Sequence, residues 1–285
     1  MKKYFGLFFI LATISYLDCF EWPQLVENQS SIFAWFGENR GSSFCSALLF
    51  SDADTVHASD EGLALAILGT NSNEDGWFSS TLGNTVILAH KNQMNTVYGN
   101  LESIDIVDST TKVKSGDILG KGGSSGWQKG KSCLEFQVLD TKLEAIINPL
   151  LLLEKKDIEH DFLVMNLKAK NRTTGLSHTL SNTLKIPPGV YALYCNREPG
   201  KMPYKITTSI NGIASDTITY NMLVRKNNRL CLQGKRPYQF TEIYPEEGRF
   251  MLAEIILTYG KNTLAITTNN SLGKEKKVKY HLEVK

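Results

Sequence analysis

Short β-rich runs, broken by glycine, asparagine, aspartate and serine, recur along this sequence. They include GLALAIL at 62–68, NTVILAH at 84–90 and MNTVYGNL at 94–101. Apolar residues do not hold the i, i+3, i+4, i+7 spacing of an amphipathic helix over any long stretch, and the best helical candidate is the short INPLLLLEKK at 147–156. Closely spaced strands separated by turn residues are typical of all-β proteins, so an all-β fold is predicted.

The strands form two sets, which indicates two domains. A length of 285 residues suits one large domain or two of ordinary size. The charged segment EKKDIEHDF separates the two sets, so we expect a first domain over 23–155, a linker over 156–161 and a second domain over 162–285. The second set has about seven short strands separated by turn signals such as PPG, NG and NN, which is typical of an immunoglobulin-like β-sandwich.

The N-terminus indicates export. Lys2 and Lys3 precede an apolar run from Tyr4 to about Leu17, the layout of a secretory signal, which we place at 1–22. This run is short for a membrane span, which needs about 20 residues, although an uncleaved signal or a lipidated Cys19 would also hold the chain at a membrane. We therefore expect a location in the periplasm or on the cell surface. The net charge of +2, without basic stretches interleaved with aromatics, gives no indication of nucleic-acid binding.

The cysteine count suggests disulfides. Removal of Cys19 with the signal leaves four of the five cysteines, and an even set in an oxidising compartment commonly pairs. The simplest arrangement has one bridge per domain, Cys45 with Cys133 and Cys195 with Cys231. The sequence leaves the pairing open, and a buried pair of free thiols is an alternative for Cys195 and Cys231.

Four motifs follow one another in a specific order in the first domain. They are TVHASDEGLALAIL at 55–68, GNTVILAHKNQMNTVYGNL at 83–101, VKSGDILGKGGSSGWQKGKSCLEFQV at 113–138 and INPLLLL at 147–153. In this order they resemble the lysostaphin/LytM-type zinc endopeptidases, which cut peptidoglycan cross-links and whose barrel-like domain contains a duplicated hybrid motif. Similar V-K-x-G-D-x-L-G runs occur in lipoyl- and biotinyl-type barrels, where glycines make tight turns, but an exported location argues against a cofactor-carrying arm.

The resemblance implies five functional positions, and all five are changed in this chain. The family binds zinc through the His and Asp of H-x-x-x-D and the second His of H-L-H, and two further histidines handle protons and the oxyanion. The three ligand positions hold Ser43, Ala47 and Glu135, and the two catalytic positions hold Asn100 and Cys133. We call these five residues the inherited positions. Moving the early motif by one residue gives Phe44 and Leu48, which supply neither a His nor an Asp.

The resemblance therefore predicts no catalytic residues, no bound metal and no cofactor, but other interpretations of the same residues are open. Cys45, Cys133 and Glu135 would offer thiolates and a carboxylate to a replacement metal site if they clustered. Cys133 with His90 would make a cysteine-protease pair only with an oriented base and a lowered thiol pKa. The glycine-rich run lacks the Gly-Lys-Ser/Thr ending of a phosphate-binding loop.

The leading hypothesis is a catalytically inactive relative that binds peptidoglycan or an envelope protein such as a cell-wall hydrolase. The alternatives are an active zinc endopeptidase with a rearranged site and a structural adhesin or scaffold that binds through its second domain. A retained peptide groove would be lined by Trp77, Phe78, His90, Asn100, Trp127, Cys133 and Glu135. Exposed tryptophans on glycine-rich loops are typical of contact surfaces.

Overall fold

The computed structural model describes residues 19–69, 80–106, 108, 110–126, 133–181 and 184–285. Most of the predicted signal segment lies outside the described residues, and so do the predicted groove residues Trp77, Phe78 and Trp127. No helix within the described ranges is long and apolar enough to cross a membrane.

The described chain consists mainly of strands, which confirms the predicted all-β class. Its helical elements are the single-turn α1 (Phe240–Ile243) and the 3-10 turns η1 (Gln29–Ser31), η3 (Lys91–Gln93) and η4 (Pro149–Leu151). The helix predicted at 147–156 is wrong. Asn148 caps η4 by accepting a hydrogen bond from Leu150 N, but the turn ends at Leu151 because Leu153 is drawn into a β-bridge with Phe20.

The first domain is arranged around one long strand, β6. Its strands are β1 (Ile32–Ala34), β2 (Leu48–Phe50), β3 (Thr55–His57), β4 (Gly62–Leu68), β5 (Asn84–Ala89), β6 (Met94–Ile104), β7 (Lys112–Val113), β8 (Ile118–Gly122), β9 (Glu135–Asp140) and β10 (Ala145–Ile147). β6 pairs antiparallel with β5, β8 and β9. Side chains that alternate along these strands, such as Tyr98, Phe136 and Val138, point into one apolar core.

The second domain is a two-layer β-sandwich. Its strands are β11 (Lys168–Asn171), β12 (Ser177–Thr179), β13 (Leu184–Ile186), β14 (Gly189–Asn196), β15 (Lys205–Ile210), β16 (Ile213–Lys226), β17 (Arg229–Gln233), β18 (Tyr238–Gln239), β19 (Arg249–Leu257), β20 (Gly260–Asn269) and β21 (Glu275–Val284). One layer is the four-stranded sheet β12-β11-β14-β19, and the remaining strands form the other layer. Leu193 of β14 shares a core with Ile206 and Ile266 of the opposite layer. An immunoglobulin-like connectivity of these strands stays a prediction.

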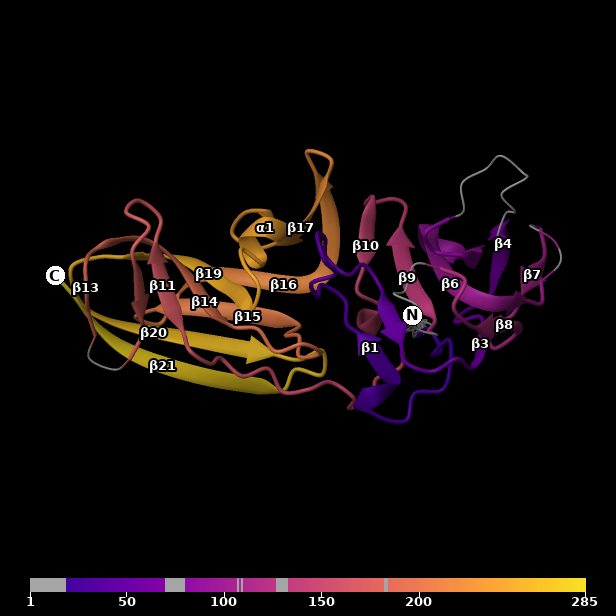
Figure 1. The fold of residues 1–285 in the computed structure, drawn as a ribbon, viewed down its shortest axis with the longest axis horizontal. Helices are drawn as coiled ribbons and strands as arrows, with labels where there is room; N and C mark the ends of the chain where they lie inside the picture. The colour runs from indigo at the N-terminus through magenta and orange to yellow at the C-terminus, as the bar shows by residue number, and fades with distance from the viewer. Residues whose placement is uncertain (1–18, 70–79, 107, 109, 127–132, 182–183) are drawn as a thin grey trace, which may run out of the picture.

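The two domains share a continuous sheet. β10 pairs antiparallel with β16, with Ala145 opposite Val224 and Ile147 opposite Met222. Figure 1 shows the domains end to end, with β16 reaching across to β10. Asn148 strengthens this connection because its Nδ2 donates to Tyr220 O at 2.8 Å.

The charged segment 156–161 packs against both domains. Ile158 is buried in the core of the first domain. Glu159 O accepts a hydrogen bond from Gln29 Nε2 at 3.2 Å, and Glu159 Oε2 accepts one from Ser271 N at 2.9 Å. This predicted linker therefore contributes to the contact between the domains.

Candidate functional site

Three of the inherited positions meet on neighbouring strands, as the resemblance implies. Glu135 begins β9, where it lies opposite Gly99 of β6 and Leu49 of β2. Asn100 follows Gly99 on β6, and Cys133 lies just before β9 in a β-bridge with Gly123. The strand register alone thus brings positions 100, 133 and 135 together.

Glu135 is buried and paired with an arginine. Only 2% of its side chain is exposed, and its two carboxylate oxygens accept hydrogen bonds from Arg40, at 2.8 Å from Nη1 and 2.9 Å from Nη2. Gln137 Nε2 donates to Glu135 Oε1 at 2.8 Å. A guanidinium that binds a carboxylate through two parallel bonds is one of the strong side-chain pairs in proteins. The guanidinium of Arg40 therefore takes the place beside this ligand position that a metal ion would take.

Asn100 is buried and its amide is fully engaged. Its Nδ2 donates to Gly123 O at 2.6 Å and to Cys133 O, while its Oδ1 accepts from Gly126 N at 2.7 Å. Its backbone has a φ of 66°, a left-handed conformation that asparagine adopts more readily than most residues. The side chain therefore fastens the glycine-rich segment to β6 and offers no group for proton transfer.

The two early inherited positions lie in different surroundings. Ser43 is exposed, whereas Ala47 is fully buried in a small cluster with Cys45, Leu49 and Cys133. Because Ala47 has no donor atom and Ser43 lies at the surface, the pair does not form half of a metal site.

Residues 37–45, which we call the junction hairpin, fold back on themselves beside the second domain. Gly37 N donates to Cys45 O and Cys45 N donates to Glu38 O, both at 2.7 Å. Glu38, which is buried, accepts a hydrogen bond from Gly200 N at 2.9 Å and pairs with Arg197 at 3.4 Å.

Aromatic contacts dock the junction hairpin on the second domain. Phe44 is buried and belongs to the core of the sandwich, where its ring centroid lies 5.4 Å from that of Phe240 and 6.1 Å from that of Tyr244. Tyr244 Oη also donates to Gly37 O at 2.9 Å. The second domain thus holds the segment that bears Ser43.

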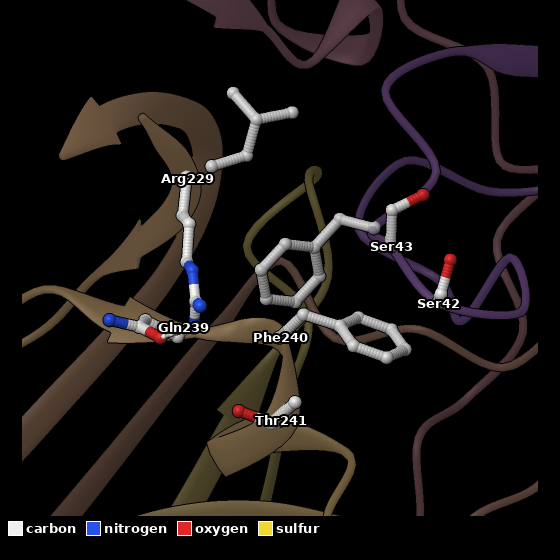
Figure 2. Close-up of a pocket in the computed structure, with 8 residues that line it drawn as sticks. Ser42, Ser43, Arg229, Gln239, Phe240 and Thr241 are labelled. Carbon is white, nitrogen blue, oxygen red and sulfur yellow. Dashed lines mark hydrogen bonds between the residues drawn. The ribbon is translucent and has the colours of Figure 1, made fainter. Parts of the chain in front are cut away.

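A cavity of about 410 Å³ lies where the junction hairpin meets the second domain. It is lined by Ser42, Ser43, Phe44, Arg229, Leu230, Gln239, Phe240 and Thr241. Figure 2 shows Phe240 between Ser42 and Ser43 on one side and Arg229 and Gln239 on the other. Ser43 therefore lines a junction between domains, apart from the buried Glu135.

A separate cleft of about 260 Å³ borders the arginine of the buried ion pair. Its lining is Phe33, Ala34, Glu38, Asn39, Arg40, Cys45, Leu49, Arg197, Pro199 and Gly200. Phe33 is the exposed apolar member, with 42% of its surface accessible. This cleft leaves a concave surface beside the inherited positions.

Neither predicted disulfide is present, because all five cysteines are free thiols. Cys45 Sγ donates to Ala47 O at 3.3 Å, and burial raises the pKa of the Cys45 thiol to about 12. Cys195 lies in the sandwich core on β14, whereas Cys231 lies on β17 of the other layer with its Sγ directed at Arg229 O. The strand placement thus separates Cys195 from Cys231.

Most of the predicted groove residues in the described chain do not line an open groove. Asn100, Cys133 and Glu135 are each at most 1% exposed because their strands pack on both sides. His90 Nδ1 lies 2.8 Å from Glu61 O and His90 Nε2 lies 2.6 Å from Thr96 Oγ1, so both ring nitrogens serve the fold. The cysteine-protease pairing of Cys133 with His90 has no support, since His90 is committed elsewhere.

Comparison with known proteins identifies the first domain. Residues 51–149 match the family model of peptidase family M23. The first domain is a LytM-type domain of peptidase family M23. A second family model matches residues 161–285. An uncharacterized protein of Treponema pallidum (strain Nichols) is 31% identical over 123 residues, which cover 39% of this chain and 80% of that protein.

The chain also resembles solved structures at low sequence identity. The SpoIIQ–SpoIIIAH pore-forming complex matches with a TM-score of 0.38 and 18% identity, over 50% of this chain and 94% of that chain. The catalytic domain of the prophage-encoded M23 protein EnpA from Enterococcus faecalis matches with a TM-score of 0.33 and 22% identity, over 41% of this chain and 87% of that chain.

The residues of this M23 domain do not fit a zinc ion. Ala47 lacks a donor atom, and Glu135 is engaged by Arg40, whose positive charge would repel a divalent cation. The part of the chain that the structure describes contains no group of three or more His, Cys, Asp or Glu able to hold a metal. The replacement site of Cys45, Cys133 and Glu135 is therefore not formed.

Two residues that shape this region, Arg40 and Phe44, were not assigned these roles from the family motifs. Arg40 lies in a turn-rich run outside the family pattern, and Phe44 resembles any apolar residue of a short strand. A cue for Arg40 did exist, because a glutamate that replaces a histidine on a buried strand requires a cation. No comparable cue indicated that Phe44 belongs to the core of the second domain.

Proposed function

We propose that this chain is an exported cell-envelope protein whose M23 domain binds peptide without cutting it. The buried pair of Arg40 and Glu135 is the observation that carries the proposal, since it engages the residue at a zinc-ligand position with a fixed cation of the chain itself. Hydrolysis by a catalytic zinc requires protein ligands with one open position for water. The inherited positions supply neither those ligands nor a proton-transferring histidine.

A binding role is supported by the cleft beside Arg40. Phe33, Ala34 and Leu49 form an apolar lining, while Arg40, Asn39 and Arg197 add polar groups. A mixed lining of this kind suits a peptide, whose side chains are apolar and whose backbone is polar. The resemblance to peptidoglycan endopeptidases makes a cell-wall peptide the expected ligand, and a cell-wall hydrolase the other partner to be tested.

Export is supported by the N-terminal sequence. Lys2 and Lys3 followed by an apolar run are typical of a signal segment. A protein that reaches the periplasm or cell surface meets peptidoglycan there, which agrees with the proposed ligand.

The test combines metal analysis, wall lysis and wall binding on the full chain. After incubation with zinc and gel filtration, we expect substoichiometric zinc, no clearing of purified cell-wall suspensions and sedimentation of the protein with those walls. Phe33→Ser should weaken sedimentation, whereas Leu63→Ser, at an equally exposed leucine (41%) on β4, should not. Stoichiometric zinc with wall clearing would establish the active-enzyme alternative, and equal sedimentation of both variants would remove the cleft from the proposal.

A further inference from the structure

The outer face of the four-stranded sheet contains a basic pocket, which is lined by residues of the second domain alone. Its volume is about 280 Å³, and it is lined by Lys168, Lys170, Gly175, Ser177, Tyr194, Pro245, Glu246 and Arg249. The register explains the grouping, because Lys168 lies opposite Tyr194 and Lys170 lies opposite Ser177. Side chains that alternate along a strand share one face, so β11 presents both lysines together.

The charges of this pocket are not balanced. Lys168 and Lys170 are two residues apart on one strand face, about 7 Å along the strand, and no carboxylate within the described ranges forms an ion pair with either. Arg249 is paired at 3.6 Å with Glu246, which is mostly exposed, and donates to Asn196 Oδ1 at 3.0 Å. Three cations therefore face one carboxylate, which leaves an excess of two positive charges.

The carboxylates next to the pocket are already engaged. Glu254 accepts from Arg172 at 3.2 Å and pairs with Lys235 at 3.2 Å and Arg236 at 3.4 Å. Glu242 is bound by Arg236 at 2.7 Å. These carboxylates are held by other cations, so the excess positive charge of the pocket is available to an external anion.

Tyr194 adds a neutral donor to the pocket wall. The residue is only 7% exposed, and burial raises the pKa of its phenol, although the charge of Arg172 works in the opposite direction. A phenol with a raised pKa keeps its proton at neutral pH and donates to an oxyanion. Ser177 supplies a hydroxyl on the neighbouring strand.

We propose that this pocket binds a phosphate monoester. A doubly charged phosphate matches the excess of two positive charges, and its oxygens accept hydrogen bonds from ammonium, guanidinium and hydroxyl groups at once. The pocket volume admits the phosphate and a small attached group. The phosphate is carried either by a small soluble molecule or by a lipid headgroup, and the experiment separates these sources.

The test measures binding of inorganic phosphate and glycerol 3-phosphate to the full chain by calorimetry in phosphate-free buffer. We expect the double variant Lys168→Gln/Lys170→Gln to bind both about tenfold more weakly. The matched control is Lys277→Gln/Lys279→Gln, which removes the same charge from two exposed lysines at the same spacing on β21. Tyr194→Phe should weaken binding by a few-fold, which charge alone would not explain.

Vesicles that contain phosphatidic acid provide the second arm, with vesicles of a phosphodiester lipid for comparison. Flotation with phosphatidic acid that requires Lys168 and Lys170 would assign a lipid source, and binding of the soluble esters alone would assign a small molecule. Equal losses in the two double variants would show general charge attraction and overturn the site. Absence of phosphate binding by the unmodified chain would also overturn it, whatever the outcome of the wall-binding experiment.

Discussion

At the level of single residues, the ion pair of Arg40 and Glu135 leaves the carboxylate at a zinc-ligand position without a free oxygen for a metal. A carboxylate on a fully packed strand is unfavourable unless a cation meets it, and Arg40 supplies two hydrogen bonds in one plane. Because the arginine is part of the chain, it is always present at the carboxylate. The strand that in the family carries ligand and catalytic histidines has become a strand joined to a neighbouring loop.

Removal of the Arg40 guanidinium should destabilise the fold. We expect Arg40→Met to lower the free energy of unfolding by about 3 kcal/mol, because Glu135 would remain buried without its cation. Urea denaturation measures this change. Arg225→Met, at an exposed arginine of β16, should change it by less than about 0.5 kcal/mol.

The double variant Arg40→Met/Glu135→Leu distinguishes a buried charge from lost packing. It should recover most of the stability, since no charge is then left unpaired. A double variant as unstable as Arg40→Met would show that the pair's charge is not the reason for the loss.

Substitution of Asn100 should lower the free energy of unfolding by a similar amount, because its amide hydrogen bonds would be lost. We expect Asn100→Ala to cost about 3 kcal/mol, because the carbonyls of Gly123 and Cys133 and the amide of Gly126 would each lose a buried partner. Asn92→Ala is the control, since Asn92 has a similar φ of 63° but is exposed. Comparable losses for the two variants in thermal unfolding would mean that backbone strain, and not the amide, is responsible.

The sequence predicted which family residues are absent from the inherited positions, but not the contacts that the residues now at those positions make. Motif order placed Asn100, Cys133 and Glu135 in one region, and the strand register agrees. It did not predict that these residues would be sealed, because burial depends on Arg40 and on the packing of β2 against β9. Contacts between residues distant in the chain are not encoded in local periodicity.

Among the elements, the junction hairpin and the outer face of the four-stranded sheet have the clearest physical roles. On that face, burial of Glu254 favours its protonated form, but the hydrogen bond and charge of Lys235, with the charges of Arg236 and Arg172, lower its pKa overall. The native state therefore binds fewer protons than the unfolded state in the acid range, and stability rises with pH there.

Acid unfolding tests this network. The contribution of Glu254 is fully present above its unfolded pKa, about 4.3, and is lost as the pH falls through its lower folded pKa. Glu254→Gln should reduce stability by about 1 kcal/mol at neutral pH and flatten its fall below pH 5. Glu247→Gln, at an exposed glutamate, should leave the pH profile of the urea midpoint unchanged.

Strand elements were well predicted where short apolar runs ended at turn residues, as at β5 and β9. The helix expected at 147–156 failed because a leucine run is compatible with several structures, and tertiary contacts of Leu150 and Leu153 decided the outcome. Elements defined by long-range pairing, such as β10 with β16, have no local signature.

The whole molecule should unfold as one unit, although its sequence indicates two domains. The shared sheet and the junction hairpin couple the two cores. Separation of the domains would expose the paired edges of β10 and β16 and the buried ring of Phe44. Three of the four tryptophans, at 35, 77 and 127, lie within 23–155, and Trp22 packs against the core of the same domain, whereas far-ultraviolet circular dichroism reports both domains. The two signals should therefore give the same urea midpoint.

Phe44→Ala provides a direct test of this coupling. Loss of a buried ring should cost about 3 kcal/mol, and the tryptophan midpoint of the first domain should shift together with that of the whole chain, because Phe44 lies in the core of the second. Phe33→Ala, at an exposed phenylalanine, should shift neither midpoint by much. Separate midpoints for the two signals would contradict the coupling.

The junction hairpin also limits whether the zinc-ligand types of the family could be introduced by substitution. Ser43→His and Ala47→Asp would restore the ligand types of the early motif, yet one new side chain would sit on an exposed hairpin and the other in a closed apolar cluster. The hairpin is held by Phe44 and Glu38, so metal binding here would also require the second domain to release it. Metal binding at these two positions would therefore require changes in both domains, and not substitution of the ligand residues alone.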